Sequence, residues 1–484
     1  MKSKIKVLFI IHDLYQDDLW FPLGIGYLSG MLLKYGIDVK IYSQDVFHYS
    51  NEELVEFLKV NDFDIIATGF LAARFKETII DLSLIINNYK KEAWYVIGGH
   101  GPSPIVEYVI SETNADIVVI GEGEETIIEI CEAKKNGDKN NLKFINGIGY
   151  CINDEIKITH SREPIKNLDD IPFPAYHLFP MNKYSVAHKG IRNYKNEKIA
   201  GIITSRGCIG ECSFCYRLEN GIRFRSIESV LDEIEFLYKN YDISFFNMMD
   251  ELFIASKKRI FEFQEKLSKK DFKIRFYGSA RVDTIDEEIL QCLKELNCTF
   301  LNYGFESMDA DVLKLMNKRT TPEQNIRAIE LTKKYDIGIA FNFIWNCRGD
   351  TLVSLKKNAE VIKKYQTYDQ IRTIRPATPY PGSPLYYYAI DNGLLKGPED
   401  FFKRFKNSDL ITVNFMNIPN EECYKQLYAI NKDLLYDYCE HSKNFSRTQV
   451  QEILKGFYNL YFKGYYNFRG SRVYTRSKNI GKKK

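Results

Sequence analysis

Short apolar runs alternate with segments of helical periodicity over residues 1–135, and this alternation restricts the fold more than any other feature. The runs are KVLFII (6–11), DVKIY (38–42), DIIATGF (64–70), WYVIGG (94–99) and DIVVIG (116–121). Between them, segments such as 23–35 and 76–88 carry apolar residues three and four positions apart. Nearly continuous apolar strands separated by helices predict a parallel sheet covered on both faces. We therefore expect an α/β, doubly wound domain of Rossmann-like type, whose ligands bind beyond the carboxyl ends of the strands.

Glycines gather at the ends of the predicted strands. They are Gly24, Gly26, Gly69, Gly98, Gly99, Gly101, Gly121 and Gly123. Because glycine has no side chain, it lets the backbone approach a ligand closely. Ordinary turns also use glycine, so the sequence leaves both interpretations open.

Residues 136–197 are predicted to connect two domains. They contain a predicted hairpin over 148–158 and the stretch LDDIPFPAYHLFP, whose prolines exclude regular helix and central strand. We interpret this stretch as a fixed strap.

The strand–helix alternation begins again over residues 198–385. Six strands are expected, at 200–204, 243–248, 274–278, 300–304, 338–344 and 371–375. A helix over 226–238 is typical of the segments between them, with Ser226 as its N-cap. Six strand–helix units predict a partial (β/α)6 barrel of the TIM type, with its chemistry at the carboxyl ends of the strands.

Residues 386–484 form a predicted helical, aromatic-rich C-terminal domain with a basic tail. After Glu452 the chain has no acidic residue and nine Lys or Arg. A surface helix with a frayed basic end explains this tail, and so does contact with an anionic substrate, a nucleic acid or a membrane surface. The net charge of +3 is too small to imply a polyanionic partner by itself, and nucleic acid binding is not expected.

Composition restricts the class of protein further. With 484 residues, of which 45% are hydrophobic and 27% charged, the chain is long enough for two or three globular domains. We expect no signal peptide and no transmembrane segment, because no apolar run approaches 18 residues. Ten cysteines without a secretory signal then favour reduced thiols and a cytoplasmic location.

Three of these cysteines crowd into the stretch RGCIGECSFCYR (206–217). Cys208, Cys212 and Cys215 have the spacing C-x3-C-x2-C, and no Cys or His follows at short range. A structural zinc site normally takes four protein ligands, so three suggest a metal centre with one open position. In a 4Fe–4S cluster, each cysteine holds one iron. A chance grouping, or a zinc site completed by a remote ligand, is the alternative.

With Phe214 directly before the third cysteine, this loop resembles the cluster loop of the radical S-adenosylmethionine superfamily. Three more stretches agree with that superfamily: MMDELF (248–253), GSARVD (278–283) and YGFES (303–307). The resemblance implies that the open iron chelates S-adenosylmethionine, and that its reductive cleavage gives a 5′-deoxyadenosyl radical. It further implies that Glu306 binds the ribose hydroxyls. The residues expected to line the cofactor are Phe214, Tyr216, Asp250, Glu251, Ser279 and Arg281.

The fifth strand departs from the superfamily pattern. WNCRGD (345–350) stands where a Gly-x-Pro-x-Glu-Thr turn is more usual, so Asn346, Arg348 and Asp350 replace a small residue, Pro and Glu. Cys347 follows the predicted strand and could face the active site or be a buried thiol.

The first domain resembles the cobalamin-binding domain that precedes many radical S-adenosylmethionine proteins. The matching stretches are 22–42, 98–103 and 115–127, and the whole resemblance covers about residues 5–385. It is to class B radical methyltransferases and the related anaerobic cyclases. The residues it places near cobalamin are Leu23, Gly24, Gly69, Gly98, Gly99, His100, Gly101, Ser103, Gly121, Glu122 and Gly123.

The D-x-H-x-x-G motif, whose His replaces the lower cobalt ligand in many cobalamin domains, is absent. His48 lies three residues after Asp45, which is not the motif's spacing. His12 and His100 lie at predicted strand ends and could approach the corrin. The absence fits a family whose lower cobalt face commonly has no His ligand, and it also fits a domain that has lost cobalamin.

The resemblance implies a radical enzyme that methylates an unactivated carbon with the help of cobalamin. Radical cyclisation, oxidation or rearrangement is the first alternative, and a non-catalytic cluster protein is the second. We expect a lipid, natural-product or other small-molecule substrate, and a one-electron reductant such as flavodoxin or ferredoxin. The sequence does not identify the substrate or the oligomeric state.

Overall fold

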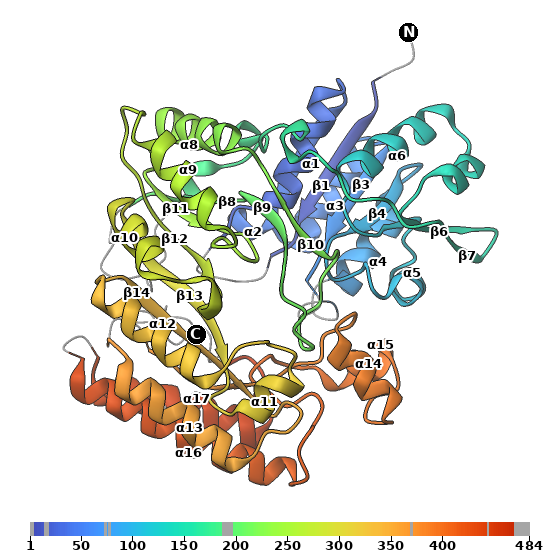
Figure 1. Cartoon of the computed structure of the whole chain (residues 1–484). Helices are drawn as coiled ribbons and strands as arrows, with labels where there is room; N and C mark the ends of the chain where they lie inside the picture. The colour runs from blue at the N-terminus through green and yellow to red at the C-terminus, as the bar shows by residue number, and fades with distance from the viewer. Residues whose placement is uncertain are drawn as a thin grey trace. The chain divides into compact units, whose positions relative to one another are not determined.

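The computed structural model describes residues 4–13, 19–71, 75, 79–185, 197–367, 371–442 and 445–468. These residues form two compact units. Unit 1 contains the described residues up to Ser185 and two short segments, Arg217–Glu219 and Arg223–Arg225. Unit 2 contains the other described residues, from residue 197 onward. Figure 1 shows the elements of both.

Within the described residues, unit 1 has a seven-stranded sheet in the order β2-β1-β3-β4-β5-β6-β7. The strands are β1 Lys6–Ile11, β2 Asp38–Ser43, β3 Ile65–Gly69, β4 Trp94–Gly98, β5 Ile117–Val119, β6 Ile148–Ile152 and β7 Glu155–Ile158. The five predicted strands are confirmed, and they pair in parallel. Because β2 and β3 both flank β1, the strand order reverses between β1 and β3, where doubly wound sheets bind their ligands.

Helices cover both faces of this sheet (Figure 1). They are α1 Leu23–Lys34, α2 Gln44–Phe47, α3 Asn51–Val60, α4 Ile80–Tyr89, α5 Val106–Thr113 and α6 Glu124–Asn136. On one face, α1 and α6 bury residues such as Met31 and Ile127 against Val7, Phe9 and Val96. Each such side chain contributes roughly 1.5–3 kcal/mol by leaving water.

The predicted hairpin is confirmed, but it joins the sheet of unit 1. β6 pairs antiparallel with β5, with Ile117 opposite Tyr150, and β7 pairs with β6. The sheet is therefore mixed and not purely parallel. Gly149 makes this possible, because a side chain there would collide with Val106 of α5.

The described part of the proline-containing strap lies on α1. It comprises the 3-10 turns η4 Leu168–Asp170 and η5 Tyr176–Leu178 and the helix α7 Met181–Tyr184. Ala175 N donates to Gly26 O at 3.0 Å. A Cβ on Gly26 would lie 2.9 Å from Pro174, and one on Gly30 would lie 2.5 Å from Phe173 O. Both glycines of α1 are therefore needed for this close approach.

Unit 2 has a six-stranded sheet in the order β15-β14-β13-β12-β11-β8 among its described residues. The strands are β8 Ile199–Ile202, β11 Phe245–Met248, β12 Arg275–Ala280, β13 Cys298–Glu306, β14 Gly338–Trp345 and β15 Arg375–Pro376. All neighbours pair in parallel and follow chain order, so the predicted partial barrel is confirmed. The last predicted strand is reduced to two residues.

Helices follow the strands of unit 2 along the outside of the curved sheet (Figure 1). They are α8 Ile227–Tyr241, α9 Lys257–Leu267, α10 Glu287–Glu295, α11 Ala310–Leu315, α12 Pro322–Lys334 and α13 Leu352–Tyr365. Ser226 caps α8 as predicted, because its hydroxyl accepts from Ser229 N at 3.1 Å.

The described C-terminal region is helical, as predicted. Its helices are α14 Pro384–Asp391, α15 Pro398–Arg404, α16 Asn420–His441 and α17 Arg447–Lys463. α16 packs against α13 and α17. The basic tail from residue 469 lies outside the described residues. No described helix is both long enough and apolar enough to cross a membrane.

Candidate functional site

The cysteine loop follows β8, at the carboxyl end of the barrel strands. Cys212 is buried, Cys208 is half-buried and Cys215 is exposed. The loop is flanked by a small two-stranded sheet, β9 Ser205–Cys208 and β10 Gly221–Phe224, which the sequence did not predict. Two backbone hydrogen bonds hold its middle: Ser213 N donates to Met316 O at 2.8 Å, and Leu385 N donates to Ser213 O at 2.7 Å. The thiols are thus presented by a fixed backbone.

Arg281 lies beside two of the thiols. A Cβ at Gly210 would be 3.0 Å from the Arg281 guanidinium, 3.5 Å from Cys208 Sγ and 3.8 Å from Cys212 Sγ. Asp283 and Lys318 O hold the guanidinium in place at 2.9 and 2.8 Å. Burial raises the pKa of the Cys212 thiol, and the positive charges of Lys318 and Arg281 oppose that shift. Burial outweighs these two charges, so the surroundings by themselves favour the neutral thiol.

Glu306 forms a buried ion pair at the end of β13. Lys318 Nζ donates to Glu306 Oε1 at 3.0 Å, and only 7% and 10% of the two side chains are exposed. Burial lowers the pKa of Lys318, but Glu306 and Cys212 outweigh it and the pKa is raised. Gly304 makes room for the pair, because a Cβ there would lie 2.9 Å from Lys318 Nζ and overlap Glu306. Sequence reasoning missed Lys318, which lies in no recognisable motif.

Asp250 and Ser279 are occupied by contacts to the protein backbone. Asp250 accepts from Thr204 N at 2.6 Å and Ser205 N at 3.1 Å, which fixes the start of the cysteine loop. The Ser279 hydroxyl donates to Asp250 O at 2.8 Å and accepts from Phe253 N at 3.1 Å. Both lie at strand ends. Asp250 supports the backbone of the cysteine loop, and Ser279 supports the turn after β11. Glu251 is exposed, and Tyr216 is half-buried.

Phe214 and Cys347 meet in one apolar cluster. Cys347 is buried among Val312, Met316 and Leu385, and Phe214 packs against the same cluster. Burial raises the pKa of the Cys347 thiol to about 12. Of the two possibilities for Cys347, the structure therefore favours the buried, unreactive thiol.

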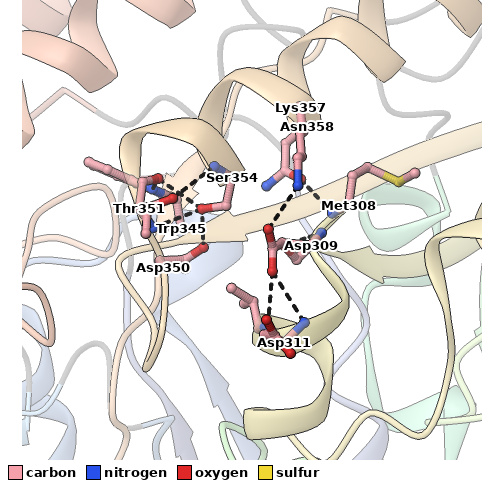
Figure 2. A network of polar contacts seen from close by, with 11 residues as sticks. Met308, Asp309, Asp311, Trp345, Asp350, Thr351, Ser354, Lys357 and Asn358 are labelled. Atoms are coloured by element: carbon pink, nitrogen blue, oxygen red, sulfur yellow. Dashed lines mark hydrogen bonds and ion pairs between the residues drawn. The ribbon is translucent and has the colours of Figure 1, made fainter.

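The unusual turn after β14 is held by a polar network, which Figure 2 shows from close by. Asp350 accepts from Ser354 Oγ at 2.7 Å and from Cys347 N at 2.9 Å. Burial raises the pKa of Asp350 to about 7. Asn346 adopts a φ of +64°, in the region where a glycine is usual, and its amide donates to Val413 O at 2.9 Å.

A second part of the network fixes the neighbouring turn after β13. Asp309 caps α11 by accepting from Asp311 N at 3.2 Å and pairs with Lys357 of α13 at 3.0 Å. Met308 N donates to the Asn358 amide at 2.7 Å (Figure 2). The residues that differ from the usual sequence of this turn therefore stand in a turn that contacts within the protein hold in place. Arg348, which stands in place of Pro, lies 3.9 Å above the ring of Tyr388.

The chemistry of this donor set suits an iron–sulfur cluster. Three thiols lie on one fixed loop, next to Arg281 and near Lys318, whose charges balance a cluster with thiolate ligands. No three His, Cys, Asp or Glu side chains converge to hold a single metal ion among the described residues. A cluster needs no such convergence, because each cysteine holds a different iron.

In unit 1 the predicted glycine loops meet through Ser103. Its hydroxyl donates to Gly99 O at 2.9 Å and accepts from Gly121 N at 3.1 Å, which joins the ends of β4 and β5. Gly99 and Gly121 have φ of +103° and +80°. Among the described residues, and apart from the adjoining backbone, no atom lies within 4 Å of a Cβ placed on Gly24 or Gly121. These two positions leave space at the carboxyl edge of the sheet, as a ligand site there requires.

The other predicted positions in unit 1 serve packing or lie at its surface. Gly69, Gly101 and Gly123 approach neighbouring protein atoms closely, Gly98 is in ordinary contact with Val119, and Leu23 is buried. Glu122 accepts from Ile165 N at 2.7 Å and from Arg223 at 2.8 Å, so its carboxylate anchors these segments. His100 is exposed.

A histidine–carboxylate pair also lies at this edge. His48 Nδ1 is 2.6 Å from Asp13 Oδ2, although 35 residues separate the two in the sequence. The pair joins the loop after β1 to the residue that ends α2, just beyond β2. Sequence reasoning missed the pairing because the two residues share no local motif.

Fold and site together define an α/β enzyme with a three-cysteine cluster loop at the mouth of a partial barrel and a preceding doubly wound domain. Residues 202–362 match the radical SAM superfamily, and residues 16–130 match the B12 binding domain. The chain belongs to the cobalamin-dependent radical S-adenosylmethionine enzymes, in the group that contains methyltransferases.

Relatives cover most of the chain. An uncharacterised methyltransferase of Pyrococcus horikoshii is 29% identical over 90% of this chain and 94% of its own length. The anaerobic magnesium-protoporphyrin IX monomethyl ester cyclase of Rubrivivax gelatinosus is 29% identical over 76% of this chain and 66% of its own length. The solved structure of the cobalamin-dependent radical enzyme OxsB, with aqua-cobalamin and S-adenosylmethionine bound, has a TM-score of 0.70 at 19% identity. It covers 94% of this chain, which covers 70% of it, and it shows the shared fold.

The cofactors of this family are a 4Fe–4S cluster, S-adenosylmethionine and cobalamin. Radical S-adenosylmethionine enzymes also need a source of electrons. The expectations of fold class, enzyme class and cofactors drawn from the sequence are thus confirmed.

Proposed function

We propose that this protein transfers a methyl group to an unactivated carbon of a small organic substrate. One observation carries the proposal: the three-cysteine loop lies at the carboxyl end of a partial barrel, in a chain that also has an open glycine edge on a B12-type sheet. Methylation of an unactivated carbon needs a radical that removes a hydrogen and a carrier that delivers a methyl group. One chain with a cluster loop and a B12-type domain can supply both. The cofactors supply a 5′-deoxyadenosyl radical, which removes hydrogen from the substrate, and a cobalt-bound methyl group.

The residues of the chain have separate tasks in this proposal. Cys208, Cys212 and Cys215 hold the cluster, and Arg281 stabilises its negative charge from beside Gly210. Glu306 receives the ribose hydroxyls, and Lys318 holds its carboxylate in place through the 3.0 Å ion pair. Asp250 positions the backbone at the start of the loop, and Ser279 holds the turn that carries Asp250. In unit 1, Gly24 and Gly121 leave room for the corrin.

The electron donor and the cellular compartment are also part of the proposal. A flavodoxin or ferredoxin is a suitable one-electron donor for a low-potential cluster. All ten cysteines are free, and a reducing cytoplasm keeps them so. We propose a lipid, tetrapyrrole or other natural product as the substrate.

Radical cyclisation is the second candidate, because the Rubrivivax gelatinosus relative carries the name of a cyclase. The mass of the product distinguishes the two. With methyl-deuterated S-adenosylmethionine and a panel of candidate substrates, methylation predicts a product in which a fully deuterated methyl group replaces one hydrogen of the substrate. A product that has lost hydrogens and carries no label contradicts methylation and favours cyclisation or oxidation.

A further inference from the structure

Arg348, in the turn after β14, carries a positive charge that the fold does not neutralise. It is half-buried, and its guanidinium carbon lies 3.9 Å from the centre of the Tyr388 ring. Across the described parts of the chain, this guanidinium makes no hydrogen bond and no ion pair. The ring attracts the charge, but the N–H groups of a guanidinium also match two oxygens of a carboxylate or phosphate. Such an oxyanion is the partner that the protein itself does not supply.

The turn that carries Arg348 is fixed without help from the guanidinium. Cys347 N donates to Asp350 at 2.9 Å, in the network that Figure 2 shows. Asn346 donates to Val413 O at 2.9 Å. Gly349 has a φ of +80°, and a Cβ there would lie 2.5 Å from Leu315. The backbone under Arg348 is therefore held in place, and its charged group has no structural task in this turn.

The pair of Arg348 and Tyr388 lies at the end of the barrel where its chemistry takes place. β14 ends at Trp345, so Arg348 follows the carboxyl end of a barrel strand, as the cysteine loop does after β8. Tyr388 belongs to α14, whose first turn is bonded to the cysteine loop: Leu385 N donates to Ser213 O at 2.7 Å. Both members of the pair are thus tied to the side of unit 2 that holds the cluster.

The surroundings of the pair are aromatic and partly exposed. Phe214 and Phe415 are both half-buried, and both pack against the apolar cluster that contains Cys347. The rings of Tyr388 and Phe415 are 6.4 Å apart. Sites for small molecules are lined mostly by apolar and aromatic side chains, with a few polar groups that fix the orientation of the ligand. One unpaired guanidinium among half-buried rings has this composition.

We propose that Arg348, held over the ring of Tyr388, is a specificity-determining residue that binds an anionic group of the substrate. The inference rests on the proposed function and narrows its substrate to an organic molecule with an apolar body and a carboxylate or phosphate. Binding is non-covalent: two N–H groups donate to two oxygens of the anion, and no proton is transferred. The proline that is more usual at this position offers no such donor.

Equilibrium dialysis without oxygen tests this inference. The full chain is reconstituted with its cluster and left unreduced, so that no turnover occurs. It is dialysed against naphthoate, naphthyl phosphate and the neutral naphthamide, which share one apolar body. We expect at least one anion to bind about tenfold more tightly than the amide, as a charge-assisted hydrogen bond allows. The anion with the higher affinity shows whether the site takes a carboxylate or a phosphate.

Variants identify the arginine. Arg348→Met should lower the affinity for the preferred anion about tenfold and leave the affinity for naphthamide unchanged. Arg348→Lys should retain part of the preference, because the charge remains without the planar fork. Arg372→Met is the matched control, since Arg372 lies 5.8 Å from the ring of Phe300, near the amino ends of the strands. All three variants should keep the midpoint of thermal unfolding close to that of the wild type.

The outcomes separate this inference from the function on which it rests. Anions that bind no more tightly than naphthamide contradict the inference, and so does a preference for anions that survives in Arg348→Met. Methylation of a neutral substrate, at equal rates in the wild type and Arg348→Met, contradicts the inference alone. An anionic product that has lost hydrogens and carries no label contradicts the proposed methylation and supports the anion site.

Discussion

Glu306 and Lys318 show how single residues define the mouth of the barrel. Glu306 is buried and holds a φ of +62° without being a glycine. Such a conformation costs on the order of 1–3 kcal/mol and persists where contacts enforce it. Here the enforcing contact is the ion pair with Lys318, in the space left by Gly304.

Replacement of Lys318 by Met should destabilise the protein strongly. The change leaves the Glu306 carboxylate buried without its cation, at a cost of roughly 3–5 kcal/mol. Chemical denaturation of the anaerobic protein measures this loss. Lys357→Met is the matched control, since Lys357 is 46% exposed in its pair with Asp309 and its loss should cost roughly 0–1 kcal/mol. Equal losses in the two variants would show that the buried pair has no special role.

Asp350 should make stability depend on pH. Burial raises its pKa to about 7 in the folded chain, from 3.8 in the unfolded one. Between these values the folded state holds a proton that the unfolded state has released. This contribution to stability is therefore present below about pH 4 and is lost as the pH rises towards 7, by up to about 1.4 kcal/mol per pH unit.

Comparison with Asp350→Asn isolates that contribution. The free energy of unfolding of the wild type, minus that of the variant, should fall between pH 4 and pH 7. A difference that stays flat across this window would mean that Asp350 is ionised in the folded chain throughout.

At the scale of elements, α16 is fastened to the sheet of unit 2 by one buried amide. Asn431 of α16 accepts from Ile374 N at 2.8 Å and donates to Ile374 O at 3.0 Å. Ile374 directly precedes β15, so this residue completes the last edge of the partial barrel. The C-terminal helices are thereby part of the barrel's structure.

Asn431→Leu should loosen that edge. It leaves a buried N–H and a buried C=O without partners, at about 1–3 kcal/mol each. Thermal unfolding should show a clearly lower midpoint. Asn392→Ala provides the comparison, because its amide bonds to Tyr388 O at an exposed helix end and its loss should be small. An unchanged midpoint of thermal unfolding in Asn431→Leu would contradict the view that Asn431 holds α16 to the edge of the sheet.

The elements that sequence predicts best are those with a strong local pattern. The five apolar runs of unit 1 and five of the six predicted strands of unit 2 appear near their expected positions, because burial on both faces leaves a continuous apolar signal. The hairpin is visible locally, but its pairing with β5 depends on a distant edge. β9 and β10 are too short and polar to give a signal.

The same contrast holds for the candidate site. The three cysteines and Glu306 stand in motifs with fixed spacing, so sequence finds them. Lys318 pairs with Glu306, 12 residues away, and Asp13 pairs with His48, 35 residues away. Folding brings these partners together, and no sequence motif predicts either pair.

At the scale of the whole molecule, the iron–sulfur cluster and the corrin are proposed to bind to separate units. The cysteine loop belongs to unit 2, and the open glycine edge belongs to unit 1. Cys212→Ala should therefore abolish cluster assembly and leave corrin binding intact. Iron content and corrin absorbance measure the two in one sample. Cys292→Ala, a buried thiol of α10, should retain both cofactors. Loss of corrin together with the cluster would contradict this independence.

Reductive cleavage of S-adenosylmethionine is the first reaction to measure. The protein is purified and reconstituted without oxygen to about four irons per chain, as one 4Fe–4S cluster requires, then reduced and given S-adenosylmethionine. The account predicts that the wild type releases 5′-deoxyadenosine and that Cys212→Ala releases none. Fully loaded wild type that forms no 5′-deoxyadenosine would contradict the account, as would equal release by Cys212→Ala.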